Sequence, residues 1–435
     1  MKQALFGFLD ATPTALHTAC ELVRVLSEHG FRRLDERERW DVRSGERYLL
    51  VRGASVVAWI QGQRAAAEAG FRIAVAHTDS PGLKLKHSAA RNQDGYLVAP
   101  VEVYGSPIVS TWLDRDLTIA GSLTVAPQAA PQARDRAALR PAAVPFRLSG
   151  ACAVIPNLAI HLNRTINDGF AYNMHDHLHA ILGIAGNGES QSEPSMTVLQ
   201  AVAGCAGVEA DQVLLAELYL CDTQPAALTG LSGELLSASR LDNRAGCFTV
   251  CDALCNSGAG DATAMGVFFD HEEIGSRSWA GADSVLLRHA IERIVGATDG
   301  STEARYRAAA ASCIISNDAA NALHPSYRDK HDRAYAPILG GGPVLKSDAN
   351  QRYATVPELS ALFAQLCRES GCTMQQLVSR ADMRPGSTVG PFSAAQTGIA
   401  AIDVGIPLLA MHSMRETAAL TDVTALRDVL LRYFR

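Results

Sequence analysis

The stretch Ala264-Met265-Gly266-Val267-Phe268-Phe269-Asp270-His271-Glu272-Glu273 decides the fold. Its first six residues are uncharged and predict a short buried strand, and four polar or charged residues follow that strand directly. In an open parallel sheet, functional sites form beyond the carboxyl ends of the strands. The stretch therefore predicts one strand of such a sheet, with its acidic residues placed at the edge where a site would form.

Three further stretches repeat this pattern. Residues 71–76 run into His77, residues 312–316 run into Asn317-Asp318, and residues 407–411 run into His412. Helices are predicted at about 13–29, 245–256 and 283–296, and a hairpin is predicted at 48–51 and 55–60. Strands that alternate with helices predict an α/β fold with a mostly parallel central sheet.

The middle of the chain has a different character. Short β-like runs are predicted at residues 96–103, 117–125 and 158–162. Residues 126–145 contain four prolines and residues 185–194 are rich in Gly, Ser and Glu, so both segments are predicted as loops. We therefore predict a discontinuous α/β domain, residues 1–88 and 232–435, interrupted by a β-rich inserted domain, residues 89–231.

Composition excludes several classes of protein. Hydrophobic residues make up 48% of the chain and charged residues 19%, as in soluble globular proteins, and the net charge of -6 gives no footprint for nucleic acid. The chain has no run of about 20 apolar residues that could span a membrane. The apolar run 4–9 is too short for a signal peptide, so we expect a cytoplasmic protein. Its ten cysteines form no CxxC pair and are predicted to be free thiols.

Candidate metal ligands stand at the ends of the predicted elements, and Asp242 lies near the start of one helix. Imidazole and carboxylate ligands together suit zinc, and also cobalt or manganese. A catalytic zinc usually has three protein ligands, whereas two ions that share a bridging carboxylate would use five. The five donors are His77, Asp242, Glu273, Asp318 and His412.

Glu272 is the carboxylate that this set leaves over. A carboxylate beside a ligand can approach a metal-activated water, so Glu272 is predicted to be the general base. The thermolysin-like HExxH helix is excluded, because Gly275 stands where its second histidine would be. Any one of these residues alone would be read as a turn or capping residue, and it is their joint placement that indicates a site.

Six motifs, taken in order, resemble the aspartyl aminopeptidase family of zinc exopeptidases. They cover nearly the whole chain, and two further motifs, Tyr104-Gly105 with Trp112-Leu113-Asp114-Arg115-Asp116 and Leu158-Ala159-Ile160-His161-Leu162, match the inserted domain of the family. The six are His77-Thr78-Asp79-Ser80-Pro81, Asp242-Asn243-Arg244, Asp270-His271-Glu272-Glu273-Ile274-Gly275-Ser276, Ser316-Asn317-Asp318, Gly342-Pro343-Val344-Leu345-Lys346 and Met411-His412-Ser413-Met414-Arg415-Glu416.

The resemblance implies a fold and an activity. The fold would be an α/β/α sandwich of the zinc-exopeptidase type. The enzyme would use two divalent ions, expected to be zinc, to release N-terminal residues from peptides, with a preference for Asp and Glu. It would work as a homo-oligomer, typically of twelve subunits.

The resemblance also implies roles for single residues. His77 and Asp318 would bind one ion, Glu273 and His412 would bind the other, and Asp242 would bridge them. Asp79 would orient the His77 ring without binding a metal itself. Substrate-binding roles would fall to Lys346, Asn321 and His324, and His161 would be a metal ligand or, as we favour, a substrate contact that reaches a neighbouring subunit.

Asn321 departs from the family, which often has histidine at this position. An asparagine donates hydrogen bonds but carries no positive charge. A preference for acidic substrates is therefore expected to be weaker here, or to rest on Lys346 and other groups.

Three other function classes are open at this point. The closest is another two-metal amidohydrolase, such as a deacylase or carboxypeptidase. A non-catalytic assembly or binding protein would have no reason to keep Glu272 beside a complete ligand set. A carbohydrate-active enzyme would need stacking aromatics, and aromatic residues make up only 6% of the chain.

Overall fold

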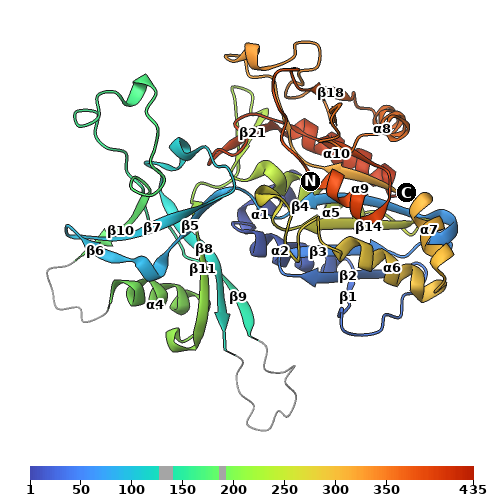
Figure 1. Ribbon diagram of the computed structural model, residues 1–435, viewed down its shortest axis with the longest axis horizontal. Helices are drawn as coiled ribbons and strands as arrows, with labels where there is room; N and C mark the ends of the chain where they lie inside the picture. The colour runs from blue at the N-terminus through green and yellow to red at the C-terminus, as the bar shows by residue number, and fades with distance from the viewer. Residues whose placement is uncertain (127–140, 186–192) are drawn as a thin grey trace, which may run out of the picture. The chain divides into compact units, whose positions relative to one another are not determined.

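The structure is a computed structural model that describes residues 1–126, 141–185 and 193–435 (Figure 1). It forms two compact units. The first comprises residues Met1–Ser80, Ala226–Met411 and Arg415–Arg435, and the second comprises Pro81–Pro225 and His412–Met414. The chain thus leaves the first unit after Ser80, whereas the sequence placed this boundary at residue 88.

A nine-stranded sheet runs through the first unit (Figure 1). Four neighbouring strands in its middle are parallel. On one side of them β3 runs antiparallel to β14, and on the other side β17 runs antiparallel to β19. The outer pairs β1–β2 and β17–β18 are each parallel, and β2 and β3 form an antiparallel hairpin. The mostly parallel sheet predicted from the sequence is confirmed. In sheet order the strands are β1 (Arg32–Arg33), β2 (Arg47–Arg52), β3 (Ser55–Ile60), β14 (Thr263–Phe269), β4 (Phe71–His77), β15 (Cys313–Asn317), β19 (Ala401–Gly405), β17 (Val344–Ser347) and β18 (Gln375–Val378).

Helices cover both faces of this sheet, because its strands are apolar on both sides. In β4, Ala74 and Ala76 pack into one core, and Ile73 and Val75 pack into the other. The α/β/α sandwich is therefore present. The first core holds α1 (Lys2–Ala11), α2 (Ala15–Glu28), α5 (Leu241–Cys255), α8 (Pro357–Glu369) and α10 (Leu420–Tyr433), and the second holds α3 (Ala66–Ala69), α6 (Leu286–Thr298), α7 (Thr302–Ala310) and α9 (Val389–Thr397).

One predicted strand of the central sheet was wrong. Residues 407–411 do not join that sheet. Within them β20 (Pro407–Leu408) pairs with β16 (Ala320–Asn321), and Leu409 forms an isolated bridge with Thr417. The sheet strand is β19, which carries Asp403 at its centre. The Asp403 carboxylate is fully buried and accepts hydrogen bonds from Thr388 Oγ1 and the Ala354 amide, both at 2.6 Å. A charged residue inside a buried strand concealed β19 from a search for apolar runs.

A small sheet of the first unit joins β12 (Ala227–Thr229), β13 (Leu235–Ala238) and β21 (Glu416–Ala419).

The three cysteines of α5, Cys247, Cys251 and Cys255, are buried in the first core, and all ten cysteines are free thiols as predicted. Among the helices that the structure describes, none is long and apolar enough to cross a membrane.

The second unit is built on an antiparallel sheet, as expected for a β-rich insertion. The predicted strand at 158–162 is wrong, because these residues lie in an irregular segment. Part of the predicted loop 126–145 is strand β9, and residues 127–140 and 186–192 of the predicted loops lie outside the described residues. The sheet order is β10 (His179–Ile184), β7 (Tyr96–Tyr104), β5 (Gly82–Leu85), β11 (Val213–Asp222), β8 (Leu117–Val125) and β9 (Ala142–Arg147), with β6 (Arg91–Gln93) beside β7 and helix α4 (Pro194–Ala206) in the same core.

Candidate metal centre

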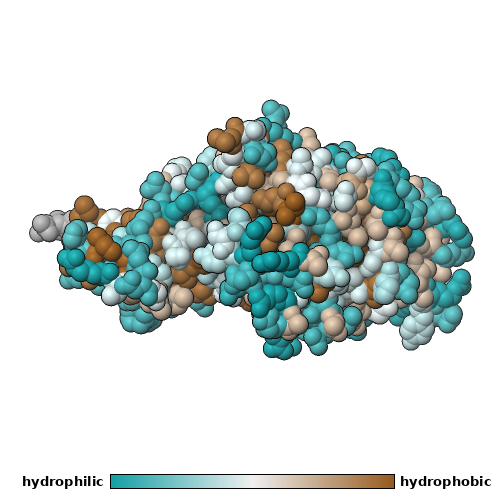
Figure 2. Space-filling model, turned by 90° about the horizontal axis from the view of Figure 1, so that it is seen from above, coloured by the Kyte–Doolittle hydropathy of each residue, from teal (hydrophilic) through white to brown (hydrophobic). Residues whose placement is uncertain are grey.

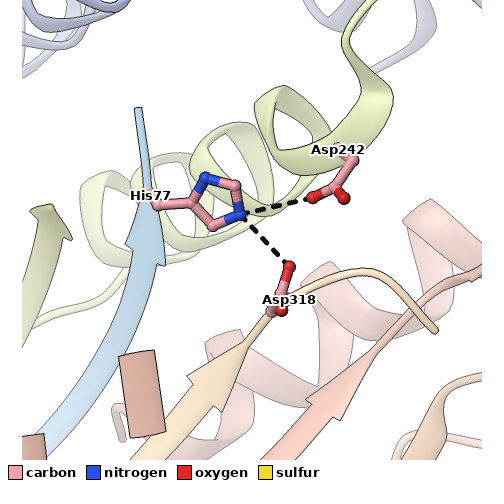
Figure 3. Close-up of side chains that lie close together, drawn as sticks. All are labelled: His77, Asp242 and Asp318. Atoms are coloured by element: carbon pink, nitrogen blue, oxygen red, sulfur yellow. Dashed lines mark hydrogen bonds and ion pairs between the residues drawn. The ribbon is translucent and has the colours of Figure 1, made fainter. Parts of the chain in front are cut away.

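His77 is the last residue of β4, and its ring lies between two carboxylates (Figure 3). Its Nε2 atom is 3.3 Å from Asp242 Oδ1 and 3.2 Å from Asp318 Oδ1. All three side chains are buried. The three residues come from a strand end, a helix start and a second strand end, which is the convergence that the sequence predicted.

The two aspartates are held together through their chain neighbours. Asn243, which follows Asp242, donates from Nδ2 to the carbonyl oxygen of Asn317 at 2.8 Å. Asn317 in turn precedes Asp318. The Asp242 amide itself donates to the buried Glu416 carboxylate at 2.9 Å. These bonds fix the separation of the two acids without using their carboxylates.

Asp79 connects His77 to the Glu272-Glu273 pair. Its Oδ1 accepts the Glu272 amide at 3.0 Å and its Oδ2 accepts the Glu273 amide at 3.1 Å. The same carboxylate lies 3.4 Å from His77 Nδ1. A carboxylate behind a ligating imidazole fixes the ring orientation and its tautomer, so this geometry supports the role predicted for Asp79.

Glu272 and Glu273 lie in a short 3₁₀ helix, Glu272–Ile274, directly after β14. His271 takes a left-handed conformation, with φ of 65°, at the point where the strand turns into this helix. One carboxylate oxygen from each glutamate and a ring nitrogen of His77 all lie within 4.8 Å of one another. The two glutamates are thus close enough to share a small site with His77.

The electrostatics of this site favour a bound cation. Burial, together with the neighbouring carboxylates of Asp318, Asp79 and Asp242, raises the pKa of Glu272 to about 8, against the opposing influence of His77. The pKa of Glu273 is also well above its ordinary value, again because of burial first and then Asp242. Several buried carboxylates around one imidazole form a donor set that suits a divalent ion.

Lys346, on β17, lies against the outer side of this cluster. It is 1% exposed, and its Nζ is 3.0 Å from the carbonyl oxygen of Asp318, 3.3 Å from Asp318 Oδ2 and 3.2 Å from the carbonyl oxygen of Ala319. These contacts orient the Asp318 carboxylate. The substrate contact that the resemblance implied for Lys346 stays a prediction.

Asn321 and His324 line a cavity of about 310 Å³ in the first unit. Three long cationic side chains, Lys330, Arg380 and Arg384, line it as well. Sequence reasoning missed these residues, although the two arginines stand close together in Arg380-Ala381-Asp382-Met383-Arg384. That spacing was the available signal, and nothing in the sequence tied it to Asp318.

The remaining two predicted residues belong to the second unit. The His412 Nδ1 atom is 3.1 Å from the carbonyl oxygen of Ser106, and a hydrogen bond there leaves Nε2 of the neutral ring with its lone pair. His161 is exposed in the irregular segment that follows Asn157. The ligand role of His412 and both roles considered for His161 stay predictions.

Comparisons with known proteins identify the family of this chain. The profile of the family described as "Aminopeptidase I zinc metalloprotease (M18)" matches residues 8–434. A Pseudomonas aeruginosa protein named "Probable M18 family aminopeptidase 2" is 40% identical over 435 residues, covering 100% of this chain and 98% of the relative. The chain belongs to the M18 family of zinc metalloproteases. It is therefore a zinc-dependent aminopeptidase, and the rival amidohydrolase classes are set aside.

Solved structures share its fold. The structure described as "Cryo-EM structure of the Ape4 and Nbr1 complex" matches with a TM-score of 0.93 at 30% identity, covering 99% of this chain and 85% of that one. The structure described as "Structure of S. cerevesiae mApe1 dodecamer" matches with a TM-score of 0.84 at 26% identity, covering 99% and 95%. The resemblance to the aminopeptidase family seen in the sequence is confirmed.

Proposed function

We propose that this M18 aminopeptidase hydrolyses peptides with two divalent metal ions and with Glu272 as its general base. The ligands would be His77, Asp242, Glu273, Asp318 and His412, with Asp242 as the bridge. The observation that carries the proposal is the buried convergence of His77, Asp242 and Asp318 beside the two glutamates. Zinc is the expected ion, and cobalt or manganese suit the same donors.

When bound, two such ions would lower the pKa of a water molecule and polarise the peptide carbonyl. The protein side chains then have distinct tasks. Glu272 takes a proton from the attacking water and gives it to the departing amine. The surrounding carboxylates attract the free α-amino group of the substrate, which explains release from the N-terminus.

Replacing Glu272 tests the role of the base. We expect Glu272→Gln to keep the metal content of the parent enzyme and to lose about 10²- to 10⁴-fold in kcat, because an amide cannot accept the proton. Metal analysis and peptidase assays on one sample measure both quantities. Glu303→Gln, an exposed glutamate on α7, is the matched control and should behave as the parent enzyme does. Full activity in Glu272→Gln would rule out Glu272 as the base.

We further propose that the enzyme prefers Asp and Glu at the substrate N-terminus. The 310 Å³ cavity beside Asn321 supports this through Arg384. The other two cations that line it are paired with acids, Lys330 with Asp329 at 3.7 Å and Arg380 with Asp382 at 2.6 Å. Asp332 is the acidic residue among its lining side chains. The cavity would compensate for the uncharged Asn321, which stands where relatives often have histidine.

Arg384→Gln tests this preference. The ratio of kcat/KM for Asp substrates to kcat/KM for Leu substrates should fall by a few-fold, which is the size of effect expected for one exposed charge. Arg328→Gln, an exposed arginine that does not line the cavity, serves as the control. An unchanged ratio in Arg384→Gln would remove the cavity from the account of specificity.

We also propose a homo-oligomer, because the S. cerevesiae relative named above is described as a dodecamer. Apolar side chains interrupt the hydrophilic surface of Figure 2. In the second unit, Leu162 is 74% exposed, Leu215 69% and Ile184 85%, and burial between subunits would remove them from water. Light scattering on the purified protein measures the assembly, and a monomer at micromolar concentration would contradict the proposal. We also propose that the protein is located in the cytoplasm.

A further inference from the structure

Arg244 is a buried arginine that stands two residues after Asp242 at the start of α5. It is 1% exposed, and it is among the largest fully buried side chains of the described residues. Its guanidinium donates to three main-chain carbonyls. Nε is 3.2 Å from the oxygen of Thr12, Nη1 is 3.3 Å from the oxygen of Asp79, and Nη1 also donates to the oxygen of Thr78.

Two of these carbonyls belong to the loop between β4 and β5, which connects several residues of the site. The carbonyl oxygen of Asp79 also lies 3.1 Å from His77 Nδ1. At the end of the same loop, Ser80 Oγ donates to the carbonyl oxygen of Asp242 at 2.6 Å. The loop and the first turn of α5 are therefore joined at two points, by Arg244 and by Ser80.

Through these contacts Arg244 can influence the positions of residues on both sides of the metal centre. A shift of the loop would move His77 directly, and through the Asp79 carboxylate it would move the Glu272 and Glu273 amides. A planar guanidinium can hold several carbonyls at fixed angles, whereas a lysine ammonium is a single point donor. The geometry requires a fork, which explains an arginine at a fully buried position.

The positive charge of Arg244 and its hydrogen bonds would have opposite effects on metal affinity. A buried positive charge repels a metal cation, so loss of the charge alone would tighten metal binding. Loss of the three carbonyl contacts would loosen the ligands and weaken metal binding. The sign of the change in metal affinity therefore separates the two effects.

We propose that Arg244 is a positioning residue, which sets metal affinity by holding the loop of His77 and Asp79 against the helix of Asp242. The proposal rests on the two-metal site described under the proposed function. Residues behind the ligands of a metal site typically alter metal affinity by 10- to 100-fold when replaced.

The test compares Arg244→Gln and Arg244→Lys with Arg47→Gln. Arg47 makes a matched set of contacts away from the site, donating to the carbonyls of His29 at 3.4 Å, Cys255 at 3.0 Å and Ser257 at 2.8 Å. Zinc dissociation constants come from competition with a chromogenic chelator, and thermal unfolding is measured on the same samples. Neither readout depends on peptidase activity.

We expect Arg244→Gln to bind zinc about 10- to 100-fold more weakly than the parent enzyme. The zinc dissociation constant of Arg244→Lys should lie between those of the parent enzyme and Arg244→Gln. Arg47→Gln should lose thermal stability while keeping the parent dissociation constant. If Arg244→Gln fails to fold, Arg244→Lys alone must still show weaker binding than Arg47→Gln.

Two results would overturn the inference. One is a zinc dissociation constant in the Arg244 variants within twofold of that of the parent enzyme, and the other is tighter binding, which would show that charge alone is at work. In both cases the parent enzyme would still bind zinc and the proposed function would stand. A parent enzyme that takes up no zinc would overturn the proposed function together with this inference.

Discussion

Asp79 and Asp422 are buried carboxylates of the first unit with different tasks. Asp79 accepts two amides of the site, whereas Asp422, on α10, accepts the Gly340 amide at 2.7 Å and the Gly342 amide at 2.8 Å in a loop before β17. The resemblance implied only that Asp79 orients His77, and the two amide contacts were not predicted. Asp422 stood in no motif, and its partners are main-chain groups that a sequence does not display.

Asp422 should make stability depend on pH. Burial raises its pKa to about 6, from 3.8, against the two amides that lower it. A carboxyl group whose pKa is raised on folding stabilises the folded state while protonated, and this contribution is lost as the pH rises through about 6. We expect the stability of Asp422→Asn relative to the parent to rise between pH 4 and pH 7, by about 2–3 kcal/mol at most.

Urea unfolding at several pH values measures this difference, and the constant cost of losing an acceptor cancels between them. Asp299→Asn is the control, because hydrogen bonds to Ser301 lower the pKa of Asp299 below 3.8. Its titration lies below the tested range, so its relative stability should be flat from pH 5 to pH 7. A flat profile for Asp422→Asn as well would show that burial of Asp422 carries no pH-dependent cost.

At the scale of elements, β4, β14 and β15 could be predicted, because each is an apolar run with polar residues at its end. β19 could not, since Asp403 interrupts its pattern. The site depends on this missed strand. The Asp318 amide donates to the carbonyl of Val404 at 2.9 Å, and a Cβ on Gly405 would lie 1.7 Å from the carbonyl oxygen of Asp318. Close packing at the end of β19 therefore fixes the position of the Asp318 main chain, and Asp318 is one of the predicted ligands.

Gly405→Ala should force the main chain of Asp318 to move. We expect a loss of about 1–3 kcal/mol in the free energy of unfolding, as for other overpacked sites, with weaker zinc binding. Gly296→Ala on α6 is the control, because a Cβ there meets nothing within 4 Å. That variant should be more stable by about 0.5–1 kcal/mol. Equal behaviour of the two variants would contradict the close contact. Chemical denaturation and chelator competition measure both effects.

At the scale of the whole chain, the division into an interrupted α/β part and a β-rich part was predictable from where the character of the sequence changes. The irregular segment around His161 was not, because Leu158, Ile160 and Leu162 alternate with other residues as a strand would. All three are exposed here, so their apolar character reflects something other than burial within this chain. Tertiary context, rather than local pattern, decided that segment.

Removal of metal should affect the two units differently. Every predicted ligand except His412 and the weaker candidate His161 belongs to the first unit. A ligand present at about 100 times its dissociation constant stabilises the folded state by about 2.7 kcal/mol. We therefore expect a chelator to lower the calorimetric transition of the first unit by about 5 °C and to leave that of the second nearly in place. Equal shifts of both transitions, or none, would contradict this distribution of ligands.

The interruption of the first unit between Ser80 and Ala226 also orders events during synthesis. His77 leaves the ribosome early, but its neighbours in the sheet, β14 and β15, follow only after the whole second unit has been translated. Asp318 then needs β17 and β19 beside it. A nascent chain therefore has no hydrolytic centre until about nine-tenths of it exists, and the newly made N-termini on the same polysome are not exposed to a half-finished peptidase.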